Sequence, residues 1–196
     1  MRIGSLDIGS CVRPADGFAA GGDAVVARSC GDVVLLAVID VLGHGPEAHR
    51  VALQAESVME EADIGDAAAL LARLDEELRG SPGAAVGIAS FRPERGEGTF
   101  VGIGNTVARL IGRTERRLVS TDGVVGQRRI AARPVAFSLD IGELVVLHSD
   151  GITSRFEVSE YSQLPSEDPT TAARELVRRF GRSYDDAACI VARRTA

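Results

Sequence analysis

The sequence has few aromatic residues and few cysteines, and each shortage excludes a class of protein. Aromatic side chains make up 4% of the 196 residues and tryptophan is absent, so the chain offers few platforms on which single-stranded nucleic acid could stack its bases. The three cysteines, Cys11, Cys30 and Cys189, are an odd number without a C-x-x-C pair, which argues against a disulfide framework or a zinc knuckle. The core is therefore expected to consist mainly of Val, Leu, Ile and Ala.

Long apolar runs and excess positive charge are also missing. The longest apolar run, VVLLAVI at 33–39, is far too short to cross a bilayer, and the N-terminal segment lacks the continuous apolar core of a signal peptide. The formal net charge of −6 and the isoelectric point near 5.1 argue against a partner that attracts basic surfaces, such as nucleic acid or an anionic membrane. We expect a cytoplasmic protein that binds neither.

The rest of the composition is that of a globular protein. Apolar residues make up 45% of the chain and charged residues 26%, which is ordinary for a folded domain. A chain of this length can bury a core without disulfides. We therefore expect one domain over residues 1–196.

Strand and helix patterns follow one another in blocks. Two β-branched-rich segments, 24–29 and 33–40, are separated by a turn signal and predict a hairpin. Two helices follow, the first with Pro46 in its first turn and the second with Asp66 as its N-cap.

The second half of the chain is rich in strand patterns. A late helix over 169–182, capped by Thr170 or Thr171, precedes a last strand at 187–194. Before it, five strands are predicted, within 83–91, 98–104, 106–112, 116–120 and 143–150. This order favours the α+β class, with antiparallel sheets and helices packed outside them.

Acidic residues stand at the ends of the most apolar strands. Asp40 ends the strand at 33–40, Asp150 ends the later apolar strand, and Asp185 and Asp186 precede the last strand. If the last strand runs antiparallel to the other two, all these acids fall on one edge of the sheet. Each acid alone is typical of a turn, where Asp commonly precedes Gly. Together they predict a cluster of carboxylates.

A cluster of carboxylates needs a proton or a cation to offset its repulsion. The chain has no paired His spacing and no C-x-x-C pair to support these acids, so the ligands expected are oxygen atoms. Oxygen ligands favour Mg²⁺ or Mn²⁺ over zinc. A glycine after an acid, as in Asp150-Gly151, is expected to let a substrate or a metal-bound water approach the backbone.

Four short motifs resemble those of the metal-dependent protein phosphatases, the PPM family, and their order and spacing are most similar to its SpoIIE-like branch. The motifs are GGDAVV at 21–26, DVLGHG at 40–45, HSDGI at 148–152 and DDAACIVAR at 185–193. The resemblance covers nearly the whole chain, and the small size is similar to that of stand-alone phosphatases of the bacterial stressosome. It implies an α-β-β-α sandwich, in which two antiparallel sheets are flanked by helices.

The resemblance further implies a centre of two Mn²⁺ or Mg²⁺ ions, with Asp40 bridging them. The ligands it implies come from all four motifs: Asp23, Asp40, the carbonyl of Val41, Asp150, and Asp185 or Asp186. Val41 stands where this branch usually has Gly, so the second ion, held by Asp23 and Val41, is expected to bind weakly. Eukaryotic relatives carry a phosphate-binding Arg before the first motif, and only Arg13 is available here.

Two such ions would activate a water and hold the phosphoryl oxygens, so hydrolysis would need no protein nucleophile. This fits a chain without a C-x₅-R motif. His44 is the candidate general acid for the leaving oxygen, and its alternative role is to shape the loop or cap the next helix. His148 is expected to be packed in the core, and His49 to lie at the surface.

We therefore expect a serine/threonine phosphatase that acts on regulatory proteins. The stressosome resemblance implies phosphorylated STAS-domain proteins as partners in a bacterial stress response. Two alternatives stay open: a phosphatase-like module that binds without turnover, suggested by Val41, and a phosphoesterase for small molecules. The absence of a G-x-x-x-x-G-K loop argues against an NTPase.

Overall fold

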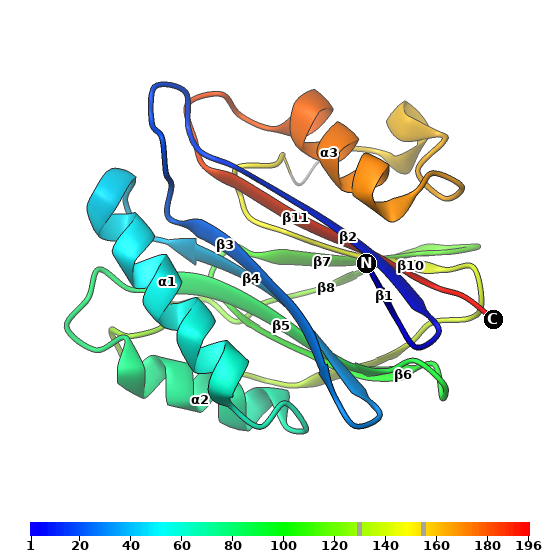
Figure 1. The fold of residues 1–196 in the computed structure, drawn as a ribbon, viewed down its shortest axis with the longest axis horizontal. Coiled ribbons are helices and arrows are strands. Elements are labelled where there is room, and N and C mark those ends of the chain that lie inside the picture. The colour runs from blue at the N-terminus through cyan, green and yellow to red at the C-terminus, as the bar shows by residue number, and fades with distance from the viewer. Residues whose placement is uncertain (129–130, 154–155) are drawn as a thin grey trace.

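Two antiparallel β-sheets pack face to face with helices on their outer faces (Figure 1). This arrangement is seen in a computed structural model that describes residues 1–128, 131–153 and 156–196. One sheet has the strand order β3-β4-β5-β6-β9, and the other β1-β2-β11-β10-β7-β8. The predicted α-β-β-α sandwich is confirmed.

Most element bounds follow the predicted blocks closely, but the two N-terminal strands, the strand at 135–138 and a short 3₁₀ turn were not predicted. The five-stranded sheet contains β3 (Asp23–Cys30), β4 (Val33–Val41), β5 (Ala84–Arg92), β6 (Glu97–Ile103) and β9 (Val135–Ser138). The six-stranded sheet contains β1 (Arg2–Ile3), β2 (Leu6–Arg13), β7 (Val107–Ile111), β8 (Glu115–Leu118), β10 (Leu144–His148) and β11 (Ala187–Arg194). The helices are α1 (Gly45–Glu61), α2 (Ala67–Glu77), α3 (Pro169–Phe180) and the short 3₁₀ turn η1 (Val158–Tyr161).

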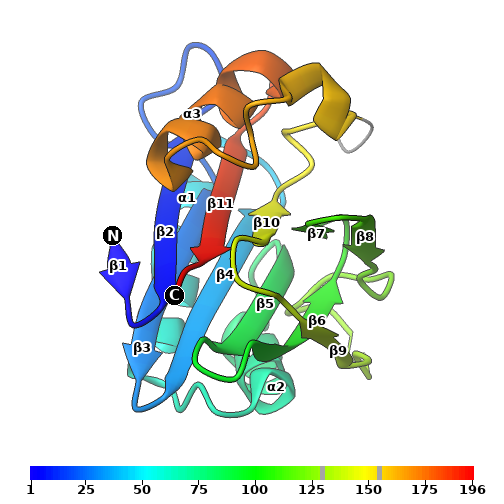
Figure 2. The ribbon, with the colours of Figure 1, turned by 90° about the vertical axis from the view of Figure 1, so that its right-hand side faces the viewer.

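The apolar run of β4 explains why the fold has layers. Side chains alternate between the two faces of a strand, and both faces of β4 are covered. Leu35 and Ile39 pack under α1 and α2, whereas Leu36 and Val38 pack between the two sheets. A third cluster lies between the six-stranded sheet and α3, which covers the opposite outer face (Figure 2).

The helix caps were only partly predicted. Asp66 caps α2 as expected, because its carboxylate accepts from the backbone N–H groups of two residues in the first turn. The cap of α3 is Asp168 and not Thr170 or Thr171. Pro169 occupies the first helical position, where no N–H is needed, and the Asp168 carboxylate accepts from both threonine N–H groups.

The sheet assignment of the acids corrects the expectation that they share one edge of one sheet. The strand β11 runs antiparallel to β10 as predicted, but β4 belongs to the other sheet. Asp40 therefore comes from the five-stranded sheet, and Asp150 and Asp185 from the six-stranded sheet. The acids meet because both sheets end at the same end of the sandwich.

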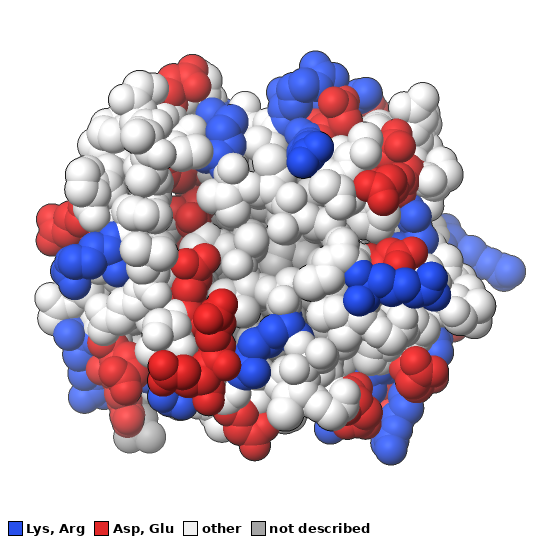
Figure 3. All heavy atoms as spheres, viewed as in Figure 1, with Lys and Arg blue, Asp and Glu red and all other residues white. Residues whose placement is uncertain are grey.

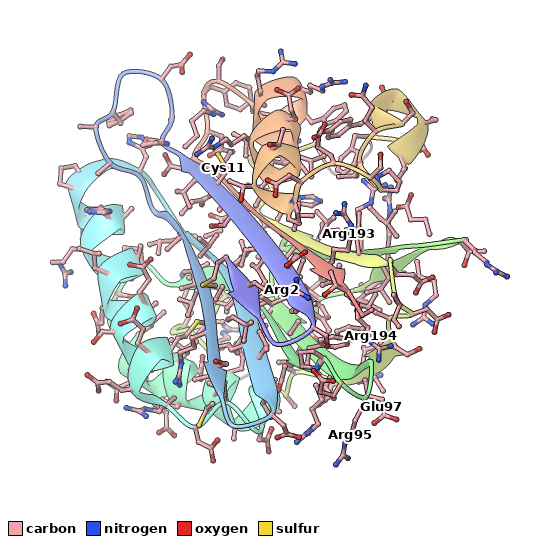
Figure 4. The ribbon with its side chains drawn as sticks, turned by 45° about the vertical axis from the view of Figure 1, so that its right-hand side comes forward. Arg2, Cys11, Arg95, Glu97, Arg193 and Arg194 are labelled. Atoms are coloured by element: carbon pink, nitrogen blue, oxygen red, sulfur yellow. The ribbon has the colours of Figure 1, made fainter. Side chains whose placement is uncertain are left out.

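At the other end of the sandwich, an arginine links the two sheets. Arg2, Arg193 and Arg194 lie around the C-terminal end of β11 (Figure 4). The Arg194 guanidinium donates to the carbonyls of Pro93 and Leu139, which follow strands of the opposite sheet. These bonds link the two sheets at the end away from the acids.

The surface mixes both signs of charge. On the face seen in Figure 3, arginines and acidic residues are interspersed. In the described parts of the chain, no helix combines the length and the apolar character needed to cross a membrane.

Candidate metal centre

Asp23 and Asp40 are direct neighbours across the β3–β4 hairpin. The register of the two antiparallel strands pairs Asp23 with Asp40. Asp23 is buried, with 7% of its surface exposed, and Asp40 is half-buried. The predicted hairpin therefore brings the first two motifs together.

Ser149 connects this hairpin to the other sheet. Its hydroxyl donates to Oδ2 of Asp23 at 2.5 Å and accepts from the backbone N–H of Ala188 at 2.9 Å. Its own N–H donates to the carbonyl of Ala188 at 3.0 Å. Ser149 is fully buried, so these bonds hold Asp23 in one orientation and fix the backbone from which Asp150 projects.

Asp150 receives a hydrogen bond from a residue that the sequence did not single out. The side-chain amide of Asn105, in the loop between β6 and β7, donates to Oδ2 of Asp150 at 2.7 Å. This bond holds one oxygen of the Asp150 carboxylate, so it also fixes the direction in which the other oxygen points. Asn105 and Ser149 are the two polar residues of the site that sequence reasoning missed.

The two adjacent acids before β11 have different roles. Asp186 is buried, and its two oxygens accept from the N–H groups of Ala15 at 2.8 Å and Gly22 at 2.6 Å. Gly21 leaves room for this, since a Cβ there would lie 2.3 Å from the Asp186 carboxylate. Asp185 is half-exposed, and burial, followed by the charge of Asp150, raises its pKa. Asp185 therefore lies beside Asp150 in the acid cluster, whereas Asp186 holds the loop before β3 and its charge adds to the effect of burial in raising the pKa of Asp23.

Gly151 does not keep the approach open for a ligand, as the sequence had suggested. A Cβ on Gly151 would lie 1.7 Å from the carbonyl oxygen of Asp186. The glycine is needed because the two loops that carry Asp150 and Asp185 touch at this point.

Arg13 holds the loop of Asp185 from the other side. Its guanidinium donates to the carbonyl of Arg182 at 2.6 Å and to that of Asp185 at 3.3 Å. It also lies 3.6 Å from a carboxylate oxygen of Asp16. Arg13 therefore stabilises the loop of Asp185 through the backbone carbonyls of that loop.

The cluster is electrostatically unfavourable without a counter-charge. Burial, and then the charges of Asp23 and Asp150, raise the pKa of Asp40 from 3.8 to about 9. Burial also raises the pKa of Asp23 from 3.8 to about 7, against the lowering effect of the Ser149 hydrogen bond. Oδ2 of Asp40 is buried and has no hydrogen-bond partner among the described residues. An unsatisfied buried carboxylate among other acids is the setting that a cation stabilises.

The possible metal ligands suit a hard divalent cation, although the side chains do not yet surround one metal position. Every side chain in the cluster offers oxygen, as Mg²⁺ and Mn²⁺ prefer. Within residues 1–128, 131–153 and 156–196, no three His, Cys, Asp or Glu side chains already form a metal-holding group. The acids are neighbours held by Ser149 and Asn105, and a cation would have to draw them together.

Val41 does not place its side chain among the acids. It lies in β4 next to Asp40, so its side chain points to the opposite face, where it is 2% exposed and packs under α1. Its N–H donates to the carbonyl of Gly22 at 3.2 Å. The Val41 side chain therefore does not crowd the acids, and the expectation that the second ion binds weakly stays a prediction.

The three histidines occupy different environments. His44 is exposed at the N-cap of α1, and its ring centroid lies 4.7 Å from that of Phe18. No side-chain cap bond from His44 is found in the described part of the chain. His148 is fully buried, as expected, and its Nδ1 lies 2.8 Å from the carbonyl oxygen of Ser149. His49, expected at the surface, is half-buried with Nδ1 3.2 Å from the carbonyl of Gly21.

Comparisons with known proteins agree with the fold. The model of the family described as Stage II sporulation protein E (SpoIIE) matches residues 31–195. A solved structure from work on the bacterial stressosome as a modular system adapted to control secondary-messenger signalling is 28% identical. It has a TM-score of 0.89, with 97% of this chain and 100% of that chain covered. No curated protein sequence matches this chain.

Two further solved structures are similar in fold alone, because their identities are low. RsbX in complex with magnesium is 16% identical, with a TM-score of 0.85 and coverage of 98% of this chain and 97% of that chain. The PP2C phosphatase domain of SpoIIE from Bacillus subtilis, with a fragment of its regulatory domain, is 18% identical with a TM-score of 0.78. That match covers 98% of this chain and 64% of the other.

Proposed function

The chain belongs to the SpoIIE family of PPM-type phosphatases, and from this premise we propose that it is a metal-dependent hydrolase of phosphoserine and phosphothreonine in proteins. The observation that carries the proposal is the Asp40 carboxylate. Its Oδ2 atom is buried and has no hydrogen-bond partner among the described residues, and the charges of Asp23 and Asp150 act on it. Such a cluster costs free energy unless it serves to bind one.

In this proposal the ligands are Asp40, Asp150, Asp185, Asp23 and the carbonyl of Val41. Divalent ions, when bound, supply an activated water and stabilise the charge of the phosphoryl oxygens. Val41 supports this assignment, because its buried side chain leaves the acids unobstructed.

The chain's own polar residues orient the acids. Asn105 holds Asp150 by its amide, and Ser149 holds Asp23 by its hydroxyl. We assign to His44, which is exposed at the N-cap of α1 and follows Asp40 by four residues, the donation of a proton to the leaving serine or threonine oxygen. Asn105 and Ser149 orient two different acids and His44 acts on the leaving oxygen, so a substitution of each residue tests a separate role.

We further propose that the substrates are phosphorylated STAS-domain proteins of a stressosome-type complex. The support is the 28% identity to a structure from stressosome work, over 97% of this chain. A purely binding role, suggested by Val41, is the alternative that the test below separates from turnover.

The test is phosphate release from phosphoserine and phosphothreonine peptides and from a phosphorylated STAS-domain protein. We expect turnover with Mn²⁺, none with EDTA, and at least a hundredfold lower kcat for Asp40→Asn. The control is Asp32→Asn, since Asp32 is exposed at the far end of β4 and pairs with Arg92 at the surface. Turnover in EDTA, or an Asp40→Asn variant as active as wild type, would contradict the proposal.

A further inference from the structure

A groove with a cavity of about 370 Å³ opens directly beside the acid cluster. Ala85 forms part of it and is the residue paired with Asp40 across β4 and β5. Asn105 also lines it and donates to Asp150. A phosphoryl group held at the acids would therefore place the neighbouring part of the substrate in this groove.

The walls of the groove are fixed by backbone hydrogen bonds between three loops. The N–H of Leu42 donates to the carbonyl of Gly83 at 2.9 Å, and that of Gly104 donates to Thr121 at 2.9 Å. Val125 and Ala84 exchange two further bonds, of 2.9 and 3.1 Å. A groove built in this way is formed before the ligand arrives, which lowers the cost of binding.

The lining combines apolar walls with one acidic side chain. Leu42 is 41% exposed and Val124 is partly exposed, so both offer apolar surface to a ligand. Asp122 is exposed at the rim and is the one charged residue among the described residues of the lining. A long basic side chain fits this combination, since its aliphatic stem packs on apolar surface while its charge stays near a carboxylate and water.

An acidic side chain is disfavoured in the same place. It would meet the negative charge of Asp122 at the rim. The groove lining offers no basic residue within the described chain that would offset this repulsion. The lining therefore discriminates by charge as well as by shape.

We propose that this groove binds an arginine or lysine side chain that lies within a few residues of the phosphorylated serine or threonine in the substrate protein. This inference rests on the proposed function and names a feature of its substrates. Asp122 is then a residue that determines specificity, and Leu42 and Val124 are the surface on which the stem of the basic side chain packs.

The test uses phosphoserine peptides of one alanine-rich sequence in which a single arginine is moved from three residues before to three residues after the phosphoserine. A second series carries glutamate at the same positions. In wild type with Mn²⁺, we expect one position where arginine exceeds glutamate in kcat/KM by about fivefold or more, mainly through KM, as for a partly exposed ion pair. Asp122→Arg should invert this ratio, and Asp122→Asn should bring it close to one.

The ratio is taken within each variant, so a change in the amount of folded enzyme cancels. Asp32→Arg, at the far end of the sandwich, is the matched control and should keep the wild-type ratio. Equal ratios in wild type at every position, or an Asp122→Arg ratio like that of wild type, would overturn the inference and leave the proposed function standing. No hydrolysis by wild type of any peptide or of a phosphorylated STAS-domain protein would overturn both, whereas hydrolysis of the protein but of no peptide would overturn the inference alone.

Discussion

The metal-free protein should lose stability as the pH rises above neutral, and Asp40 should be the main cause. The folded protein holds a proton on Asp40 up to a pKa of about 9, whereas the unfolded chain releases it near 3.8. Above pH 7 the folded state therefore binds one more proton than the unfolded state. Under this condition the free energy of unfolding falls with rising pH.

The size of this loss follows from the linkage relation. Each pH unit in this window changes the free energy of unfolding by about 1.4 kcal/mol per proton, so going from about pH 7 to about pH 8.5 costs about 2 kcal/mol. For a domain of this length, 1 kcal/mol corresponds to roughly 2–4 °C, so the melting temperature should fall by about 4–8 °C. Asp23, with a pKa of about 7, adds to the loss in the lower part of the window. Burial lowers the pKa of His148 to about 4, so its titration affects stability only below about pH 6.5.

The assay is thermal unfolding in EDTA at several pH values for wild type, Asp40→Asn and the control Asp32→Asn. The amide of Asp40→Asn does not titrate, so this variant should show a much smaller pH slope and should exceed wild type in stability at about pH 8.5. Asp32→Asn should follow wild type. Parallel pH slopes for wild type and Asp40→Asn would refute the reasoning.

Three further predictions concern single side chains. Arg109→Ala should lower the free energy of unfolding measured in urea by about 1.5–3 kcal/mol, because it removes a fully buried guanidinium that pairs with the solvent-accessible Glu115 at 2.6 Å, whereas the exposed Arg178→Ala should change it little. Ser149→Ala should weaken Mn²⁺ binding more at pH 7 than at pH 8.5, as seen by calorimetry, because loss of its hydrogen bond raises the pKa of the carboxylate it contacts. Asp168→Ala should cost about 1 kcal/mol in thermal unfolding, as removal of an N-cap does, whereas Thr170→Ala should cost less.

The elements that were predicted well are those whose apolar pattern is strong. β4 and β5 are buried on both faces and read as continuous apolar runs. β2 was missed because Leu6, Ile8 and Val12 are separated by polar residues and a glycine, which leaves no continuous apolar run. β9 was missed because it has four residues after a proline.

The acid cluster was predictable in its members but not in its details. Strand ends show in the sequence, so Asp40 and Asp150 could be named. Asn105 and Ser149 contact acids that are 45 and 126 residues away, and no local pattern reports such contacts. The choice between Asp185 and Asp186 depended on where the loop before β3 lies, which only the tertiary structure determines.

The most direct test of the central claim is a calorimetric titration of the protein with Mn²⁺ at about pH 7.5 in buffers of different ionisation enthalpy. We predict that wild type and Asp32→Asn bind Mn²⁺ and release at least one proton, because Asp40 must ionise to serve as a ligand. Asp40→Asn should lose most of the binding and the proton release. Absence of binding by wild type, or equal binding by Asp40→Asn, would contradict the assignment of the acid cluster as a metal centre.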